Sequence, residues 1–492
     1  MRGGTGRRLG ALAAHLCSGN VEPAADVSDD SPPPDEFWFS DGYEHARERF
    51  IEAVAGLTNA EHFALPLEPV EYWGGASPDA QAFEGGRLTI DVAVIKGQGA
   101  AAHSGPLTVH LSGVHGLEAF AGCAIQLKFL ADLAAGRTTV PADTTTILVH
   151  CVNPYGFKYS RRYNENNVDL NRNFIVPGVA DEFDATGQAV LDAAGRPKPL
   201  TFEWLRSAHP LMEAHDKFVA PWAKWTRPWE DGDEAKMMEG QKEYTRALAT
   251  ALGVSATPTA TAPRGEVYAA PGGLKQLAVS GQYYDREGVF YGGERLQASH
   301  TALLQFLEQR CDKYDPVMMV DVHSGLPAGP GCDDTVMLIA APGTEAFVQE
   351  FTETALGDPK DEGYTLGDPL DKGNASAGYE LMRGHLAGYL GAMKLAAAGG
   401  GWTRGAYIVQ EFATNDTVPL AGARDSAAFV HGAAPEELAT AKRMSENAFY
   451  VRTPEWRAAI IRRGTDVLRR MQAGLQQRHA ELPAVAGNMR VV

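Results

Sequence analysis

The sequence has few cysteines and no long apolar run. Its 492 residues include five cysteines, an odd number, and none of them forms a CxxC pair. We therefore expect neither a disulfide framework nor a cysteine-built zinc site, and a reducing compartment fits best. No run reaches the roughly 18 apolar residues that a membrane span requires. No membrane span is expected.

Basic residues and several catalytic motifs are also scarce. The chain has 44 basic against 62 acidic residues and a formal net charge of -18, which argues against nucleic acid or an anionic membrane as the main partner. It contains no GxSxG, HExxH or P-loop motif, which disfavours serine hydrolases, zincins and nucleotide hydrolases. A small or peptide-like substrate fits better.

The composition divides the chain into an extension and one domain. Residues 1–35 are rich in Gly, Ala, Ser and Asp, so we expect a flexible N-terminal extension. Its basic start and short apolar patch are typical of a targeting segment, but His15 interrupts the patch and no clean cleavage site follows. This favours the cytoplasm, with secretion and an organelle as alternatives. We expect one catalytic domain over 36–492, with an insertion at 177–265.

The rest of the chain alternates strand-like and helix-like patterns. The order strand, helix, strand over 107–152 predicts a parallel unit with a crossover. We expect an α/β fold with a mixed, largely parallel central sheet flanked by helices on both faces. Strands are predicted at 69–73, 88–95, 107–111, 144–152, 317–325, 335–341 and 407–412, and helices at 43–57, 118–133, 202–218, 233–252, 298–314 and 435–477.

One short stretch carries the first chemical signal. In 107–121, an apolar strand pattern breaks at Ser112-Gly113, and His115 and Glu118 follow three residues apart. An imidazole and a carboxylate at that spacing suit two ligands of one zinc ion. Taken alone, such a pair more often marks a solvated helix face, so a third ligand has to come from elsewhere.

Two later strands end in polar side chains. Asp321 and His323 alternate with valines, so they share one face of a strand. Glu411 lies in a strand that otherwise reads as core, where an unpaired carboxylate costs several kcal/mol unless a metal or partner is near. The alternatives are a satisfied core histidine at 323 and a salt bridge at the sheet edge for Glu411.

The loop 153–174 is the second informative stretch. It is dense in Asn and Arg and has almost no aliphatic residue before Val168, so we expect surface turns or a binding loop rather than core. Arg161, Arg162 and Arg172 offer forked cations suited to a carboxylate or an oxyanion. The alternative is that these arginines are solvated.

Together, these stretches resemble a known family. SGVHGLEAFAG (112–122), NPYGF and RRYNENNVDLNRNF (153–174), GVFYGG (288–293), DVHSGL (321–326) and QEFAT (410–414) occur in this order. They are similar to the zinc carboxypeptidase family, most closely to its uncharacterised carboxypeptidase-like branch, related to aspartoacylase-type deacylases.

The resemblance implies roles for individual residues. His115, Glu118 and His323 would hold Zn²⁺, Glu411 would be the general base and acid, and Asp169 would orient the first histidine.

Four further residues would meet the substrate. Asn171 and Arg172 would grip its terminal carboxylate, Arg161 or Arg162 would contact the oxyanion, and Tyr389 would cap the site. The sequence departs from the family in having 205 residues between Glu118 and His323 and alanine at 413.

We therefore expect a zinc-dependent hydrolase that cleaves an amide bond next to a carboxylate-bearing residue, namely a metallocarboxypeptidase. Its substrate would be a peptide or an N-acyl amino acid with a free carboxylate. The alternatives are an aspartoacylase-type deacylase and a non-catalytic binding protein on the same fold. The four positions that carry metal and base, His115, Glu118, His323 and Glu411, are all filled.

Overall fold

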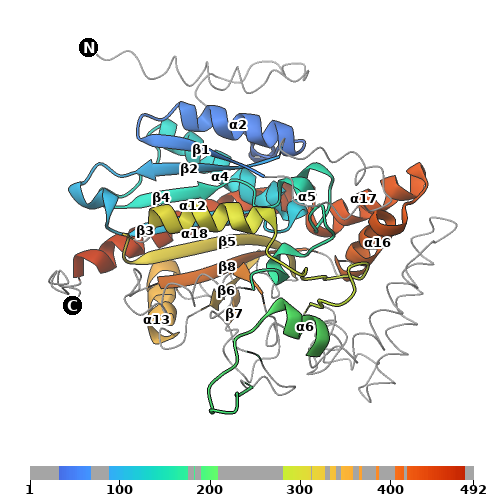
Figure 1. Ribbon diagram of the computed structural model, residues 1–492. Coiled ribbons are helices and arrows are strands. Elements are labelled where there is room, and N and C mark those ends of the chain that lie inside the picture. Colours follow the sequence, from blue (N-terminus) through green and yellow to red (C-terminus); the bar gives the residue numbers. More distant parts are fainter. Residues whose placement is uncertain are drawn as a thin grey trace, which may run out of the picture.

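A single mixed sheet organises the molecule (Figure 1). The computed structural model describes residues 33–67, 88–175, 182, 190–208, 281–311, 313–326, 333–339, 345–357, 365–367, 384–386, 405–414 and 418–481. Within these residues the sheet has eight strands: β1 (Ala60–Pro66), β2 (Thr89–Lys96), β3 (Leu107–Ser112), β4 (Thr145–Val149), β5 (Val317–Leu326), β6 (Asp334–Ile339), β7 (Thr365–Gly367) and β8 (Gly405–Ala413).

The strand order is β1-β2-β4-β3-β5-β8-β6-β7. The central strands β4, β3, β5 and β8 run parallel to one another, whereas β1, β2 and β6 add antiparallel pairings. Because parallel strands end at the same edge of a sheet, the segments that follow β3, β4, β5 and β8 all emerge together. The α/β fold with a mixed sheet is thus confirmed.

Helices cover both faces of the sheet. In Figure 1, α12 lies in front of the sheet and α18 behind it. Helix α18 packs against α4 and α13, and α4 also packs against α2. The described helices are α2 (Tyr43–Ala55), α4 (Ala119–Ala134), α5 (Pro154–Lys158), α6 (Phe202–Ala208), α12 (Ala298–Cys311), α13 (Glu345–Leu356), α16 (Val418–His431), α17 (Pro435–Phe449) and α18 (Pro454–Glu481), with 3-10 turns η1 (Asp35–Trp38), η2 (Ala100–His103), η3 (Gly116–Glu118) and η4 (Leu170–Arg172).

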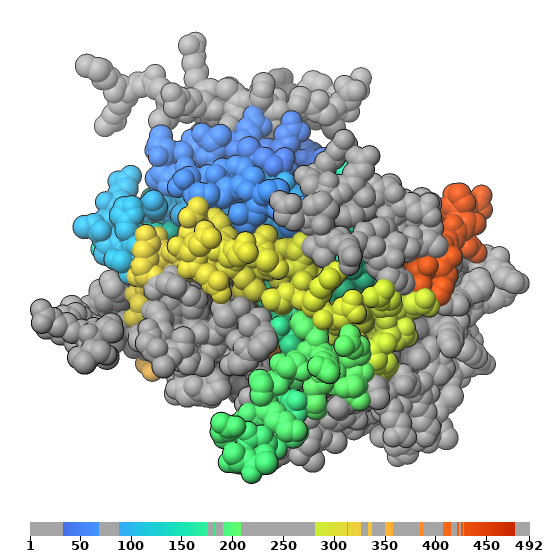
Figure 2. Space-filling model, in the orientation of Figure 1, coloured from blue at the N-terminus to red at the C-terminus, as the bar shows by residue number. Residues whose placement is uncertain are grey.

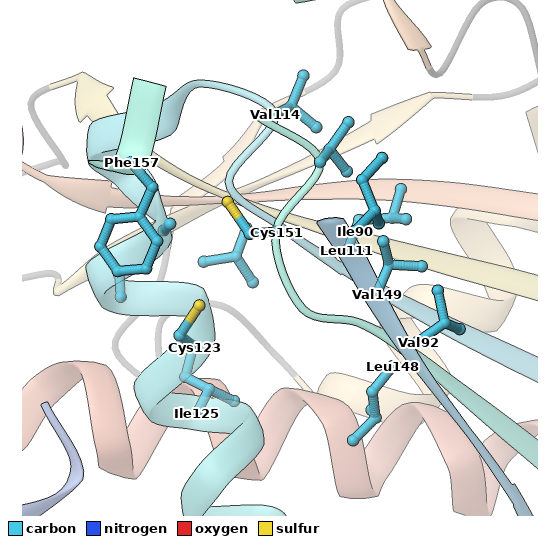
Figure 3. Packing of buried hydrophobic residues seen from close by; sticks show 14 of the residues in the cluster. Ile90, Val92, Leu111, Val114, Cys123, Ile125, Leu148, Val149, Cys151 and Phe157 are labelled. Carbon is cyan, nitrogen blue, oxygen red and sulfur yellow. The ribbon is translucent and has the colours of Figure 1, made fainter. Parts of the chain in front are cut away.

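The main core lies between the sheet and helix α4. Strands β3 and β4 are buried along their whole length, and so is β2 except for its last residue. Figure 3 shows Ile125 of α4 and Phe157 of α5 in the same cluster as Val92 and Leu148 of the strands. These side chains are nearly all aliphatic or aromatic, so their burial supplies the main stabilising term for the sheet.

Most predicted elements are confirmed, with shifted ends. The strands at 88–95, 107–111, 317–325 and 407–412 and the helices at 43–57, 118–133 and 298–314 all form. The strand predicted at 144–152 ends at Val149, and the helical region 435–477 consists of α17 and α18, which are separate helices. Strands β1 and β7 and helices α13 and α16 were not predicted.

Several predictions lie wholly or partly outside the described residues. These are most of the N-terminal extension, the strand at 69–73, the helix at 233–252 and most of the insertion at 177–265. Of the helix predicted at 202–218, the described part is α6. In Figure 2 residues 190–208 (green) adjoin residues 281–311 (yellow), and there Phe202 contacts Tyr283 edge to face at 6.3 Å between ring centres.

None of the described helices combines the length and the apolar character needed to cross a membrane.

Candidate metal centre

Three neighbouring strands bring the candidate residues to one edge of the sheet. His115 follows β3, while His323 and Glu411 lie near the carboxyl ends of β5 and β8. The strands β3, β5 and β8 are adjacent, and His323 and Glu411 are direct partners in the β5–β8 register. Side chains of paired residues point to the same face of a sheet, so both face the same space.

A tight turn after β3 presents His115 and Glu118. Gly113 has a φ of +65°, and a Cβ atom there would lie 2.8 Å from the Cβ of Ala119 and 2.9 Å from the sulfur of Cys151. Glycine is therefore required for both the conformation and the space. The 3-10 turn η3 follows at once, and the Glu118 N–H donates to the His115 carbonyl at 3.0 Å. This brings both side chains to the sheet edge.

The donor atoms of His115, Glu118 and His323 converge. His115 Nδ1 lies 2.8 Å from Glu118 Oε1, and His323 Nδ1 lies 2.7 Å from Glu118 Oε2. One donor atom from each residue lies within 4.8 Å of the other two, and all three side chains are buried. In the part of the chain that the structure describes, this is the one such group of His, Cys, Asp and Glu. It is a candidate metal site.

The opposite nitrogens of both imidazoles face carboxylates. His115 Nε2 lies 3.2 Å from Asp169 Oδ1, and His323 Nε2 lies 2.9 Å from Asp321 Oδ2. A carboxylate at Nε2 keeps a proton on that nitrogen, so Nδ1 is the nitrogen that would give up its proton to bind a metal. Both histidines direct Nδ1 toward Glu118.

The charges in the centre shift its pKa values. Burial alone lowers the pKa of His323, but Asp321 and Glu118 hold it well above its ordinary value of 6.5. Burial alone raises the pKa of Glu118, but the two histidines hold it well below its usual range. The cluster thus binds positive charge strongly, and protons and a divalent cation would compete for it.

Glu411 faces the same space from β8. A Cβ atom built on Gly325 would lie 3.4 Å from Glu411 Oε1 and 3.8 Å from Glu118 Oε1. The two carboxylates therefore both border the end of β5, and a larger residue at 325 would project between them. Glu411 is buried, and Glu118 lies against the two imidazoles. Glu411 therefore lies close to the candidate metal donors.

The two adjacent arginines point to different partners. Arg162 donates from Nε to Asp169 Oδ2 at 3.0 Å and from Nη1 to Glu118 Oε1 at 3.4 Å. Arg161 instead forms a buried ion pair with Asp425 at 2.9 Å, and its guanidinium stacks 3.7 Å from the ring centre of Phe429. Arg162 therefore lies at the candidate metal centre, whereas Arg161 ties the loop to helix α16.

Arg162 also affects the electrostatics of Asp169. Burial alone raises the pKa of Asp169, but Arg162 and His115 hold it well below its usual range. Asp169 therefore stays ionised, and its two oxygens divide their donors: Oδ1 accepts from the Asn171 N–H at 3.0 Å, on the side of His115, and Oδ2 accepts from Arg162. Asp169 therefore faces His115, and its role in orienting that histidine stays a prediction.

The candidate carboxylate grip lies next to this arrangement. Arg172 is buried, and its Nη1 donates to the Asn171 carbonyl at 2.9 Å. The side-chain oxygen of Asn171 accepts from the Leu386 N–H at 3.1 Å. Arg172 is close enough to Asp169 to help lower its pKa. The third candidate, Tyr389, lies outside the described residues.

The loop 153–174 corrects one expectation. It was expected to lie outside the core, yet most of it is buried, and Lys158 is its one exposed residue. Its asparagine side chains form hydrogen bonds with buried backbone N–H and C=O groups, which apolar side chains could not do. Asn164 Oδ1 accepts from the Val168 N–H at 2.9 Å, and Asn153 Nδ2 donates to the Arg162 carbonyl at 3.1 Å. A polar segment can be core when its side chains replace water as partners.

The segment 288–293, which is itself buried, is hydrogen-bonded to this loop. The Asp169 N–H donates to the Tyr291 carbonyl at 2.7 Å, and Asn173 Nδ2 donates to the Gly292 carbonyl at 2.8 Å. The ring of Phe290, whose φ is +52°, lies 5.3 Å from Arg162 Cζ and 6.0 Å from Arg172 Cζ. The motif GVFYGG therefore supports the loop that carries Asp169 and Arg162.

Two contributors had no assigned role at the level of sequence. The sequence places Asp321 on the same strand face as His323, and this spacing is a signal that could have identified it as the partner of the imidazole. Tyr407 donates to Asp321 Oδ2 at 2.8 Å, and nothing in its sequence context indicated this, because the contact joins two strands 86 residues apart.

Comparison with solved structures finds distant likenesses. Bovine thrombin-activatable fibrinolysis inhibitor, in complex with tick carboxypeptidase inhibitor, is 10% identical with a TM-score of 0.40, over 89% of this chain and 95% of that one. A metallo-carboxypeptidase from Burkholderia cenocepacia is 11% identical with a TM-score of 0.37, over 88% and 69%. Carboxypeptidase A from Helicoverpa armigera is 12% identical with a TM-score of 0.39, over 90% and 79%.

No curated protein matches the chain. A family model described as "Protein of unknown function (DUF2817)" matches residues 39–192 and 269–463. The two matched segments contain all the described residues of the candidate metal centre and most of the chain. The protein therefore belongs to the DUF2817 family.

Proposed function

We propose that the protein is a zinc-dependent hydrolase that cleaves an amide bond next to a carboxylate-bearing residue, as a metallocarboxypeptidase does. One observation carries the proposal: His115 and His323 both turn Nδ1 toward Glu118 while a carboxylate engages each Nε2. Two imidazoles and one carboxylate are a donor set of catalytic zinc sites, which keep a further position open.

The donor set fits zinc better than other common metals. Magnesium and calcium prefer oxygen ligands, whereas two of the three groups here are imidazoles. A zinc ion bound there would supply Lewis-acid polarisation of a substrate carbonyl and activation of water at neutral pH. His115, Glu118 and His323 would hold the ion, and Asp169 and Asp321 would keep the imidazoles in the binding tautomer.

The protein's own groups would carry the proton transfers. Glu411 and Glu118 both border the end of β5, so the Glu411 carboxylate is placed to accept a proton from the attacking water and deliver it to the leaving amine. Its burial excludes competing solvent, and in such a site each electrostatic contact is stronger than in water. Glu411 is therefore the proposed general base and acid.

The arginines would bind negative charge at two places. Arg162 lies at Glu118 and can stabilise the oxyanion that develops on the scissile carbonyl. Arg172, farther along the same loop, is the proposed partner of the substrate carboxylate, since a planar guanidinium binds a carboxylate through two parallel hydrogen bonds. This pairing would select substrates that end in a free carboxylate.

The test is a hydrolysis assay on zinc-loaded protein. A panel would contain N-acylated dipeptides, the same dipeptides with amidated C-termini, and N-acetyl amino acids. The proposal expects turnover of substrates with free carboxylates, loss of turnover after chelation and recovery on adding zinc. Cleavage of N-acetyl amino acids alone would indicate a deacylase. Fully zinc-loaded protein that cleaves nothing in the panel would support the non-catalytic alternative.

A further inference from the structure

The side chain of Tyr407 links two strands behind the candidate metal centre. It lies on β8, four residues before Glu411, and its hydroxyl donates to Asp321 Oδ2 on β5 at 2.8 Å. In the register of the two strands, Tyr407 pairs with Met319 and Asp321 with Val409, so Tyr407 and Asp321 are diagonal neighbours on one face. Such neighbours are within reach of an aromatic side chain.

A continuous series of contacts runs from this hydroxyl to the metal donors. The same oxygen of Asp321 that accepts from Tyr407 lies 2.9 Å from His323 Nε2, and His323 Nδ1 lies 2.7 Å from Glu118. Tyr407, Asp321 and His323 are all buried. We propose that Tyr407 is a positioning residue of the metal centre, which holds Asp321 so that His323 presents Nδ1 to the ion. This inference rests on the metal site proposed above.

The physical argument concerns the freedom of the Asp321 carboxylate. A hydrogen bond to an ionised carboxylate is stronger than one between neutral groups, and burial strengthens it further. Among the described residues, Asp321 Oδ1 has no hydrogen-bond partner. Tyr407 and His323 therefore both act on Oδ2, and without the hydroxyl the carboxylate can rotate and exchange its two oxygens.

The other histidine has a different support. Asp169, which faces His115, accepts hydrogen bonds from Arg162 and from the Asn171 N–H. Two donors besides the imidazole therefore fix Asp169, whereas one, the Tyr407 hydroxyl, fixes Asp321 among the described residues. Tyr407 thus donates to the carboxylate that faces His323, as Arg162 donates to the carboxylate that faces His115. Removing a single oxygen atom should accordingly loosen His323.

The experiment measures zinc affinity, by competition with a chromophoric chelator, in Tyr407→Phe, Asp321→Ala and the double variant. Loss of a group that orients a metal-binding histidine costs about 10- to 100-fold in affinity. We expect a loss on the order of 10-fold for Tyr407→Phe and a larger loss for Asp321→Ala. The double variant should match Asp321→Ala, because Tyr407 acts through that carboxylate. Asp321→Val is a second choice if Asp321→Ala does not fold.

Tyr43→Phe is the matched control. The Tyr43 hydroxyl is also buried and bonded, accepting from the Thr89 N–H at 2.9 Å, but it lies on α2. This variant should lose stability and keep its zinc affinity. Wild-type affinity in Tyr407→Phe, or losses that multiply in the double variant, would overturn the inference. If the wild type binds zinc but hydrolyses nothing, only the proposed activity fails. A wild type that binds no zinc removes both.

Discussion

The molecule contains two pairs of buried histidines with opposite surroundings. In the core pair, the Gln126 side chain lies 3.1 Å from His110 Nδ1 and 3.2 Å from His150 Nδ1, and neither Nε2 has a hydrogen-bond partner among the described residues. In the site pair, His115 and His323, both ring nitrogens face carboxylate oxygens. His110 and His115 are only five residues apart.

The difference shows in the charge that each pair can hold. Burial lowers the pKa of His110 to about 4 and that of His150 to about 3, so both are neutral core residues. His323 is equally buried, yet two carboxylates hold its pKa well above 6.5. Burial therefore does not distinguish a structural histidine from a candidate ligand. The carboxylates on either side of the ring do.

The largest effect should come from neutralising the proposed base. Glu411→Gln should lower kcat by about 1,000-fold, in the range expected for loss of a general acid–base group, while zinc stays bound because Glu411 is not among the three donors. The matched change in the core pair, His110→Gln, should leave kcat within about twofold. Steady-state kinetics with metal analysis of both variants checks this. Zinc lost from Glu411→Gln would make Glu411 a ligand instead.

The adjacent arginines provide the next contrast. Arg162→Lys should lower kcat/KM by about 100-fold, because lysine lacks the planar fork that reaches two acceptors and stabilises an oxyanion. Arg161→Lys removes part of a buried ion pair with Asp425 and should lower the melting temperature instead. Kinetics and thermal denaturation of both variants measure the two effects. A greater loss of kcat/KM in Arg161→Lys would reverse the assignment.

Arg172 should affect substrate selection more than rate. Arg172→Ala should raise KM for substrates with a free C-terminal carboxylate by about 10-fold, equivalent to about 1.4 kcal/mol. Amidated substrates lack the charge that Arg172 would bind, so their KM should change little. Parallel KM measurements on a peptide and its amide test this. An equal loss for both would mean that Arg172 stabilises the loop rather than binding the substrate.

The core pair should make the stability of the protein depend on pH. Because the folded-state pKa values of His110 and His150 are depressed, the unfolded chain binds protons that the folded chain does not. Stability should therefore fall as the pH drops below 6.5 toward about 4 and 3, with up to about 1.4 kcal/mol per pH unit from each histidine. Denaturant unfolding of wild type and His110→Gln across this range measures it. An unchanged slope in His110→Gln would contradict the neutral core assignment.

The sequence was most informative where hydrophobic patterns were strong. Strands β3 and β5 and helix α4 were predicted because apolar patterns of that length are typical of buried strands and helices. The edge strand β1 was missed because its residues are only partly buried and alternate weakly. Helices α13 and α16 were also missed, as was β7, which has only three residues.

The candidate site was partly readable for a different reason. Two of its features are local: the i, i+3 spacing of His115 and Glu118, and the position of His323 at a strand end. Both could therefore be recognised from the sequence alone. Which of Arg161 and Arg162 faces the site depends on the backbone conformation that precedes them, where Ser160 has a φ of +56°. Contacts between distant strands, such as Tyr407 with Asp321, follow from sheet register, which local patterns do not specify.

The most direct measurement is the zinc content of purified wild type, His323→Ala and His150→Gln, by mass spectrometry of the metal after exhaustive dialysis. The account predicts one zinc per chain in the wild type and in His150→Gln, and its loss in His323→Ala. A wild type without zinc, or His323→Ala with one zinc per chain, would contradict the claim that His115, Glu118 and His323 together hold a metal ion.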